Sequence, residues 1–318
     1  MSRPSVLIVC VFCAAGLLGA ANLAGCRPAG PPQAKVPDRA DGLAALALLP
    51  AGTEIVLSLD LRRLRGQPVW KALSSALARN AGPVLSDIAA GIGLDPARQV
   101  HRLWVGLPGE RQNDGRFVLL AETDPINAAR ATTWLKNRTR GELSVVLLTP
   151  KQILVSKGVW AQDTRAHLSH SAADNTELRR LCERAAGEHS AWFAAVVPPT
   201  LRHTLMEAGR FSDVASLGRV FGFLGDAAGL HVELVGEFGN TTDPPQVAHR
   251  LEALRNQAKR DPDMLVAGLS PYLEAVHVDA RDACIRIALD LPDSQAGNVI
   301  ERIEALARTP RTKYSRRP

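Results

Sequence analysis

The chain has 318 residues, 46% of them hydrophobic, and a formal net charge of +6. Six positive charges lie outside the body of the chain, one near its start and the others in its last residues: Arg3, Arg308, Arg311, Lys313, Arg316 and Arg317. The body between them is electrically balanced, which argues against the basic stripe that nucleic-acid binding needs. Its length is enough for two domains of ordinary size.

The first apolar segment begins near Val6, follows Arg3 and ends in Leu23-Ala24-Gly25-Cys26. A positive start, an apolar centre shorter than the roughly 20 residues of a spanning helix, and small residues before the cut are the layout of an export signal. Leu, two small residues and Cys resemble the lipobox of bacterial lipoproteins. The resemblance implies that residues 1–25 are a signal peptide, that Cys26 is lipidated and that the lipid holds the mature chain on a membrane.

Residues 26–42 are rich in Pro, Ala, Gly and charge, and are predicted to be a flexible tether. Arg27 stands where an Asp signals inner-membrane retention in enterobacterial lipoproteins. By this resemblance the protein is expected in the cell envelope, at the outer membrane and facing the periplasm. Residues 308–318 are predicted to be a disordered basic tail, which either stays in solvent or contacts anionic lipid headgroups.

The first half of the body, residues 43–170, is predicted to contain strands and helices in alternation. Ile55, Leu57 and Leu59 alternate with other residues as a half-buried strand does. A helix is then predicted through Leu64 and Val69. Two hairpins are predicted beyond it, with strands at residues 100–107, 116–122, 143–149 and 152–156.

A short sequence motif of the first half recurs in the second half. Thr123-Asp124-Pro125 returns as Thr242-Asp243-Pro244, and alignment without a gap brings Ala129 onto Ala248. In both places the motif predicts a capped helix with proline at its first position, followed by a hairpin and a closing helix. In the second half this hairpin and helix are predicted at residues 273–279, 283–291 and 296–306.

The recurrence predicts an internal duplication. The expected fold class is α+β, with two related domains at residues 43–170 and 171–307, each an antiparallel sheet with helices packed on one face. The very apolar segment 214–230 is predicted to be a buried helix, with the lining of a lipid or ligand pocket as the alternative.

The start of the body also resembles bacterial families of secreted or lipid-anchored proteins of unknown function. The resemblance lies in Pro50 and Ala51 before a strand that ends at Asp60. Over much of the rest of the mature chain the sequence is similar only in general character, without a diagnostic motif. The resemblance has no catalytic residues to transfer. Motifs for a serine nucleophile, a phosphate loop, a zinc-binding helix or a Cys-x-x-Cys pair are also lacking in the sequence.

Two cysteines remain after the signal peptide is removed and Cys26 is lipidated. These are Cys182, on the apolar side of an expected helix, and Cys284, in an expected strand. An oxidising periplasm permits a disulfide between them, and a buried thiol is the alternative for Cys182.

One group of potential metal ligands lies near the domain boundary. His167 and His170 stand close in sequence to Asp163 and Asp174, but without a spacing that directs them to one point. Zinc sites need three or four convergent ligands, so we interpret the group as linker residues, with a metal site as the alternative.

A more coherent polar group is predicted on one side of the second sheet. Strand alternation places His231, Glu233 and Glu237 on the side opposite Leu230, Val232, Leu234 and Phe238. Three further charged residues and a histidine join them if the strands pair as expected: His277, Asp279, Arg286 and Asp290. The indole of Trp104 is expected on an outer face as well. These residues are a candidate binding surface, and a solvated sheet face is the alternative.

The sequence therefore favours a non-enzymatic, lipid-anchored binding or scaffold protein without a cofactor. The expected partners are the membrane, through Cys26, and an envelope protein, glycan or lipid, but not nucleic acid. One alternative is a carrier of a lipid or other apolar ligand, and another is a metal-dependent hydrolase.

Overall fold

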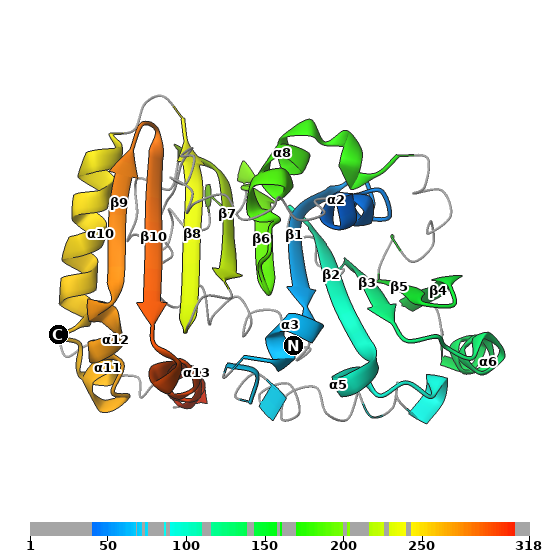
Figure 1. Ribbon diagram of the computed structural model, residues 1–318. Coiled ribbons are helices and arrows are strands. Elements are labelled where there is room, and N and C mark those ends of the chain that lie inside the picture. Colours follow the sequence, from blue (N-terminus) through cyan, green and yellow to red (C-terminus); the bar gives the residue numbers. More distant parts are fainter. Residues whose placement is uncertain are drawn as a thin grey trace, which may run out of the picture.

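In the computed structural model, ten strands form one continuous antiparallel sheet in the order β4-β5-β3-β2-β1-β6-β7-β8-β10-β9 (Figure 1). The structure describes residues 40–308 except 68, 72–73, 76–85, 87–89, 110–115, 139–142, 158–159, 161–169, 200–201, 204–215, 226–228 and 240–242. The lipobox, most of the expected tether and nearly all of the basic tail thus lie outside the described residues.

The first half of the chain supplies one side of the sheet. Its elements are α2 (Ala40–Leu46), β1 (Thr53–Asp60), α3 (Leu61–Arg65), α5 (Pro96–Gln99), β2 (Val100–Pro108), β3 (Phe117–Thr123), α6 (Ala128–Arg138), β4 (Leu143–Thr149) and β5 (Gln152–Lys157). The strand positions and the two hairpins predicted from alternation are confirmed, with shifts of one residue at some ends.

The second half supplies the other side. Its elements are η2 (Ala172–Asp174), α8 (Thr176–Ala185), β6 (Ala191–Val196), β7 (Leu217–Gly225), β8 (Leu230–Phe238), α10 (Pro244–Ala258), α11 (Pro262–Val266), α12 (Ser270–Glu274), β9 (Val276–Arg281), β10 (Cys284–Leu291) and α13 (Asp293–Arg308). The predicted hairpin of β9 and β10 is confirmed.

The two halves share one topology. Apart from the short helices α3 and α5 in the first half and α11 and α12 in the second, the order is a helix, three strands, a second helix and two strands, as α2-β1-β2-β3-α6-β4-β5 and again as α8-β6-β7-β8-α10-β9-β10. The strand orders within the sheet also correspond, as β1-β2-β3-β5-β4 and β6-β7-β8-β10-β9. This correspondence supports the internal duplication predicted from the Thr-Asp-Pro repeat.

The halves join edge to edge at the middle of the sheet. Strand β1 pairs antiparallel with β6, where Leu57 lies opposite Phe193. On one face of this joint α2 packs beside α8, the helix in the corresponding position of the other half (Figure 1). Strand pairing is therefore continuous across the division predicted between residues 170 and 171.

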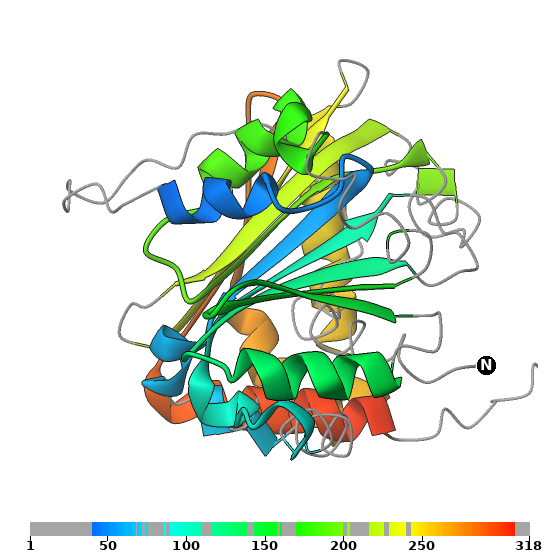
Figure 2. The ribbon, with the colours of Figure 1, turned by 90° about the vertical axis from the view of Figure 1, so that its right-hand side faces the viewer.

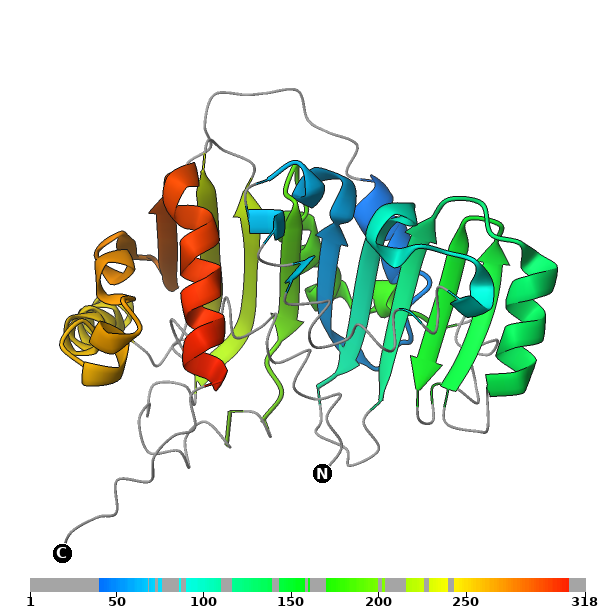
Figure 3. The same cartoon turned by 90° about the horizontal axis from the view of Figure 1, so that it is seen from below.

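Helices lie against both faces of the sheet, whereas the sequence suggested only one (Figures 2 and 3). On what we call the α8 face, Leu46 and Leu178 from α2 and α8 share a buried cluster with Val56 of β1. On the opposite face, the α13 face, Leu64 of α3 and Val299 of α13 share a cluster that contains strand residues such as Ala121.

Two sequence predictions of helices need correction. The apolar segment 214–230 is largely strand β7, because both faces of the sheet are covered there and a strand between two covered faces is apolar on both sides. Helix α6 begins at Ala128 instead of Pro125, because Ile126 N donates to the Pro150 carbonyl and Asn127 caps the helix through Arg130 N.

Candidate functional site

The candidate site lies on the α8 face of strands β8, β9 and β10. Strand register places Glu233 opposite Ala288, Ala288 opposite His277, and Asp290 opposite His231. Polar residues whose side chains share this face include His231, Glu233, Glu237, His277, Asp279, Arg286 and Asp290, and we call these seven the outer charged face. Alternation in the sequence predicted this shared side.

The helices that contact β9 and β10 pack on the other face. Val247 and Leu251 of α10 cluster with Ile285 of β10, and Tyr272 of α12 clusters with Leu289. These strand residues alternate with the charged ones. As a result His277, Asp279 and Asp290 are exposed, and the side chain of Asp290 keeps 61% of its accessible area.

Glu237 is the centre of a partly buried ion-pair cluster at one end of this face. Its carboxylate, 6% exposed, accepts hydrogen bonds from the guanidinium groups of Arg180 and Arg184 on α8 and of Arg219 on β7. Arg219 also pairs with Glu177 at the start of α8. The cluster therefore fixes α8 to the sheet through charge as well as through apolar packing.

The electrostatics of Glu237 follow from these contacts. Burial alone would raise the pKa of this carboxyl group, because it disfavours the charged form. Hydrogen bonds from Arg180 and Arg219 outweigh burial and hold the pKa of Glu237 below its usual value. The carboxylate is thus charged at neutral pH and already has its partners.

A second cluster surrounds Glu233 and His231. Arg286 Nη2 lies 2.6 Å from Glu233 Oε2, and His231 Nε2 lies 3.8 Å from the same oxygen. The other ring nitrogen of His231, Nδ1, lies 2.5 Å from Asp290 Oδ1. The imidazole therefore stands between a buried and an exposed carboxylate, an arrangement that favours the imidazolium.

Two pKa shifts express this coupling. The nearby carboxylate of Glu233 raises the pKa of His231, burial opposes the rise, and the hydrogen bond to Asp290 adds to it. Burial on its own would raise the pKa of Glu233, but His231 and Arg286 together lower it. Both groups are consequently stabilised in their charged forms.

We expect His231 to make stability depend on pH near neutrality. Its folded-state pKa lies above the unfolded value of about 6.5, so its contribution is complete below about pH 6.5 and is lost as the pH rises through the folded pKa. Urea unfolding between about pH 6 and about pH 9 should show a loss of about 1 kcal/mol that is absent in His231→Gln. An equal loss in both proteins would contradict this role.

An aromatic contact borders the second cluster. The His189 ring stacks on Phe223 with centroids 3.8 Å apart, and Phe223 lies 5.8 Å from the His231 ring. The side chain of His231 keeps 22% of its accessible area, whereas that of Asp290 keeps 61%. His231 therefore contacts Phe223 as well as the carboxylates of Glu233 and Asp290.

Sequence reasoning missed the arginines that neutralise Glu237. Arg180 and Arg184 are spaced i, i+4, so they lie on one side of α8. They flank the apolar residues Leu181 and Cys182, and a paired arginine stripe beside an apolar stripe was an available signal. The partner carboxylate, however, lies on a strand far along the chain.

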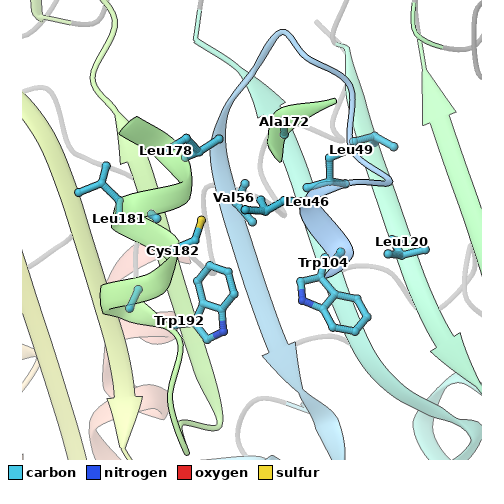
Figure 4. Close-up of a cluster of buried hydrophobic side chains, with 14 of the residues drawn as sticks. Leu46, Leu49, Val56, Trp104, Leu120, Ala172, Leu178, Leu181, Cys182 and Trp192 are labelled. Carbon is cyan, nitrogen blue, oxygen red and sulfur yellow. The ribbon is translucent and has the colours of Figure 1, made fainter. Parts of the chain in front are cut away.

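Trp104 does not belong to a binding surface, which corrects the sequence prediction. Its side chain is only 5% exposed and lies on the α8 face among Leu46, Leu120 and Trp192 (Figure 4). The prediction assumed that the side of the strand opposite Leu103 meets solvent. Because α2 and α8 cover that side, the indole is part of the core.

The two described cysteines do not form the disulfide that the sequence permitted. Cys182 lies in the cluster under α8, whereas Cys284 lies in the cluster under α10, and both are buried thiols. Burial raises the pKa of the Cys182 thiol to about 12, so it is protonated at neutral pH.

The potential metal ligands near the boundary are only partly described. His167 and Asp163 lie outside the described residues, and the ring of His170 is exposed, 4.0 Å from Asp174. Within the part of the chain that the structure describes, no three or more His, Cys, Asp or Glu side chains gather in a way that would hold a metal ion.

The fold and the outer charged face define an α+β protein with a duplicated antiparallel sheet. It is similar to the solved crystal structure of TP0453 (crystal form I), with a TM-score of 0.48 and 11% sequence identity over 86% of this chain and 99% of that one. No family model and no curated protein sequence matches the chain. Among the described helices, none is both long and apolar enough to cross a membrane.

Proposed function

We propose that the protein is a non-enzymatic, lipid-anchored binding protein of the bacterial cell envelope that presents the outer charged face to a partner. The observation that carries the binding role is this face: exposed polar residues on the edge strand β9 and its neighbour β10, namely His277, Asp279 and Asp290, with α10 packed on the other side of these strands. The membrane location rests on the lipobox at Cys26.

The position of α2 suits a chain held from its start. Leu46, at the end of α2, is completely buried against the α8 face, so the body is fixed to the chain from this point on. Residues 27–39 lie between Cys26 and α2, and even fully extended they reach no more than about 45 Å. A lipid on Cys26 would therefore keep the start of α2 within about 45 Å of the membrane surface.

The ion pairs beneath the face favour binding over catalysis. Glu233 and Glu237 are buried and paired with arginines, which leaves His277, Asp279 and Asp290 as the accessible groups on a rigid sheet. Rigid positioning lowers the entropy lost on association. Arg286, whose side chain is 38% exposed, adds a positive charge beside these carboxylates, and an exposed surface with both signs of charge fits a protein partner of complementary charge.

The apolar carrier is less well supported, because the segment that suggested it is a central strand. Phe221, at its centre, is 1% exposed and packs in the cluster under α8. The apolar character of residues 214–230 is thus accounted for by packing on both faces of the sheet.

Photo-crosslinking in intact cells tests the binding role. A photoreactive residue replacing Asp279, whose side chain is 55% exposed, should give one discrete adduct. Mass spectrometry of the purified adduct then identifies the partner as protein, glycan or lipid, and we expect protein.

The matched control is Val266, which is 90% exposed but lies on α11, away from the outer charged face. The same photoreactive residue at position 266 should give no such adduct. Absence of an adduct at position 279, or the same adduct at both positions, would contradict the proposed surface.

A further inference from the structure

The two edge strands of the sheet occupy corresponding positions in the two halves but differ in chemistry. Strand β9 ends the second half and carries the exposed His277, Asp279 and Arg281. Strand β4 ends the first half with the sequence Leu-Ser-Val-Val-Leu-Leu-Thr, without a charged residue or proline. Proteins usually protect sheet edges with charge, proline or a covering element. One edge here has such protection in its sequence and the other does not.

Neighbouring helices increase the difference in protection between the edges β9 and β4. Helix α10 packs against β9, and Arg255 Nη1 of α10 donates to the carbonyl of Val276 at 2.7 Å, which caps the start of this edge. Helix α6, the corresponding helix, lies beneath β4 on the α13 face, as seen in Figure 2, which looks onto this edge. Among the described residues, the backbone ladder of β4 runs to β5 only.

The side chains of β4 are also unusual for a strand of this composition. Ser144, Val145, Val146, Leu147 and Leu148 are all only partly buried. Val145 and Leu147 pack toward the cluster on the α13 face and Leu148 toward that on the α8 face. Val146, the middle residue of the strand, belongs to neither cluster. Within the part of the chain that the structure describes, this apolar strand has side chains that are incompletely buried and a backbone edge that pairs with no strand on its outer side.

We propose that β4 pairs antiparallel with β4 of a second copy of this chain, around a two-fold axis at Val146. Self-pairing sets Val145 opposite Leu147 and Ser144 opposite Leu148, so no like charges meet. The same operation at β9 would bring rows of charged side chains together. Joining of sheet edges by an antiparallel pair is already how the two halves of the chain meet, at β1 and β6.

The geometry of this pairing suits two copies on one membrane. A two-fold axis between antiparallel strands of one sheet is perpendicular to the sheet, so the α8 faces of both copies point the same way. Helix α2 lies on that face in each copy, and residues 27–39 precede it. Both chains can then be anchored to the same membrane, a consequence that rests on the proposed lipid at Cys26, whereas the pairing itself does not.

Co-purification of two differently tagged full-length copies from the same cells tests the pairing. Wild-type copies should co-purify. Val146→Lys in both copies, or Val146→Glu in both, sets like charges against each other and should reduce co-purification about tenfold or more. One Lys copy with one Glu copy should restore it, which also shows that both variants fold.

A cysteine pair gives an independent readout. Val146→Cys should form a disulfide-linked dimer in membranes, because the two residues would face each other across the axis. Val266→Cys is the control, since Val266 is 90% exposed and would react more readily by random collision. Failure of wild-type copies to co-purify, wild-type levels with Lys in both copies, or equal crosslinking at positions 146 and 266 would overturn the proposal. Because the pairing does not require the lipid, Cys26→Ser copies should still co-purify. Absence of lipid from wild-type Cys26 would overturn only the anchor and leave the dimer intact.

Discussion

Glu237→Gln is expected to destabilise the fold by about 2 to 3 kcal/mol. The substitution keeps the shape of the side chain but removes the charge that neutralises Arg180, Arg184 and Arg219. Loss of one member of a buried pair is costly because the other charges remain without compensation. The arginine side chains keep part of their exposure, up to 44% for Arg180, which places the expected cost below that of a completely buried pair.

The matched control is Glu177→Gln. Glu177 pairs with the same Arg219, but its side chain is 41% exposed, so its removal should cost no more than about 1 kcal/mol. Urea denaturation of the two variants measures the difference. Equal midpoints would show that burial of Glu237 adds nothing to the stability of the fold. The ion pairs of Glu237 would then not help to hold α8 on the sheet.

Cys26→Ser is expected to abolish lipidation of the protein. The lipid is attached to the thiol of this residue if the lipobox is used, and a hydroxyl group cannot replace it. Metabolic labelling with a fatty-acid analogue should therefore mark the wild-type protein and leave the variant unmarked. The variant should also remain uncut and keep its signal peptide.

Cys13→Ser is the control for that experiment. Cys13 lies in the same apolar segment but is removed with the signal peptide on this reading. Label and cleavage should both persist in Cys13→Ser. Persistence of label in Cys26→Ser would show that the lipid is attached elsewhere.

Strand positions were predictable because they depend on neighbours in sequence. Ile55, Leu57 and Leu59 point to one side of β1, and the alternation is visible without knowledge of the fold. The same holds for the outer charged face, since His231, Glu233 and Glu237 alternate with apolar residues whose side is covered. Where one face is covered and the other is open, period two identifies the strand.

What the sequence did not reveal depends on contacts between distant segments. Strand β7 does not alternate between apolar and polar residues, because both of its sides are covered. Trp104 is buried because helices cover its side of the sheet as well. Likewise, Glu237 resembled an exposed carboxylate until α8 brought Arg180 and Arg184 over it. Alternation gives the side to which a residue points, whereas cover on that side is decided by the packing of helices from elsewhere in the chain.

The mass of the N-terminal peptide of the mature protein, isolated from membranes, tests the central claim most directly. We predict a peptide that begins at Cys26 and carries a diacylglycerol on the thiol, with a further acyl chain on the new amino terminus. A peptide that begins at another residue, or an unmodified Cys26, would contradict a lipid-anchored envelope protein.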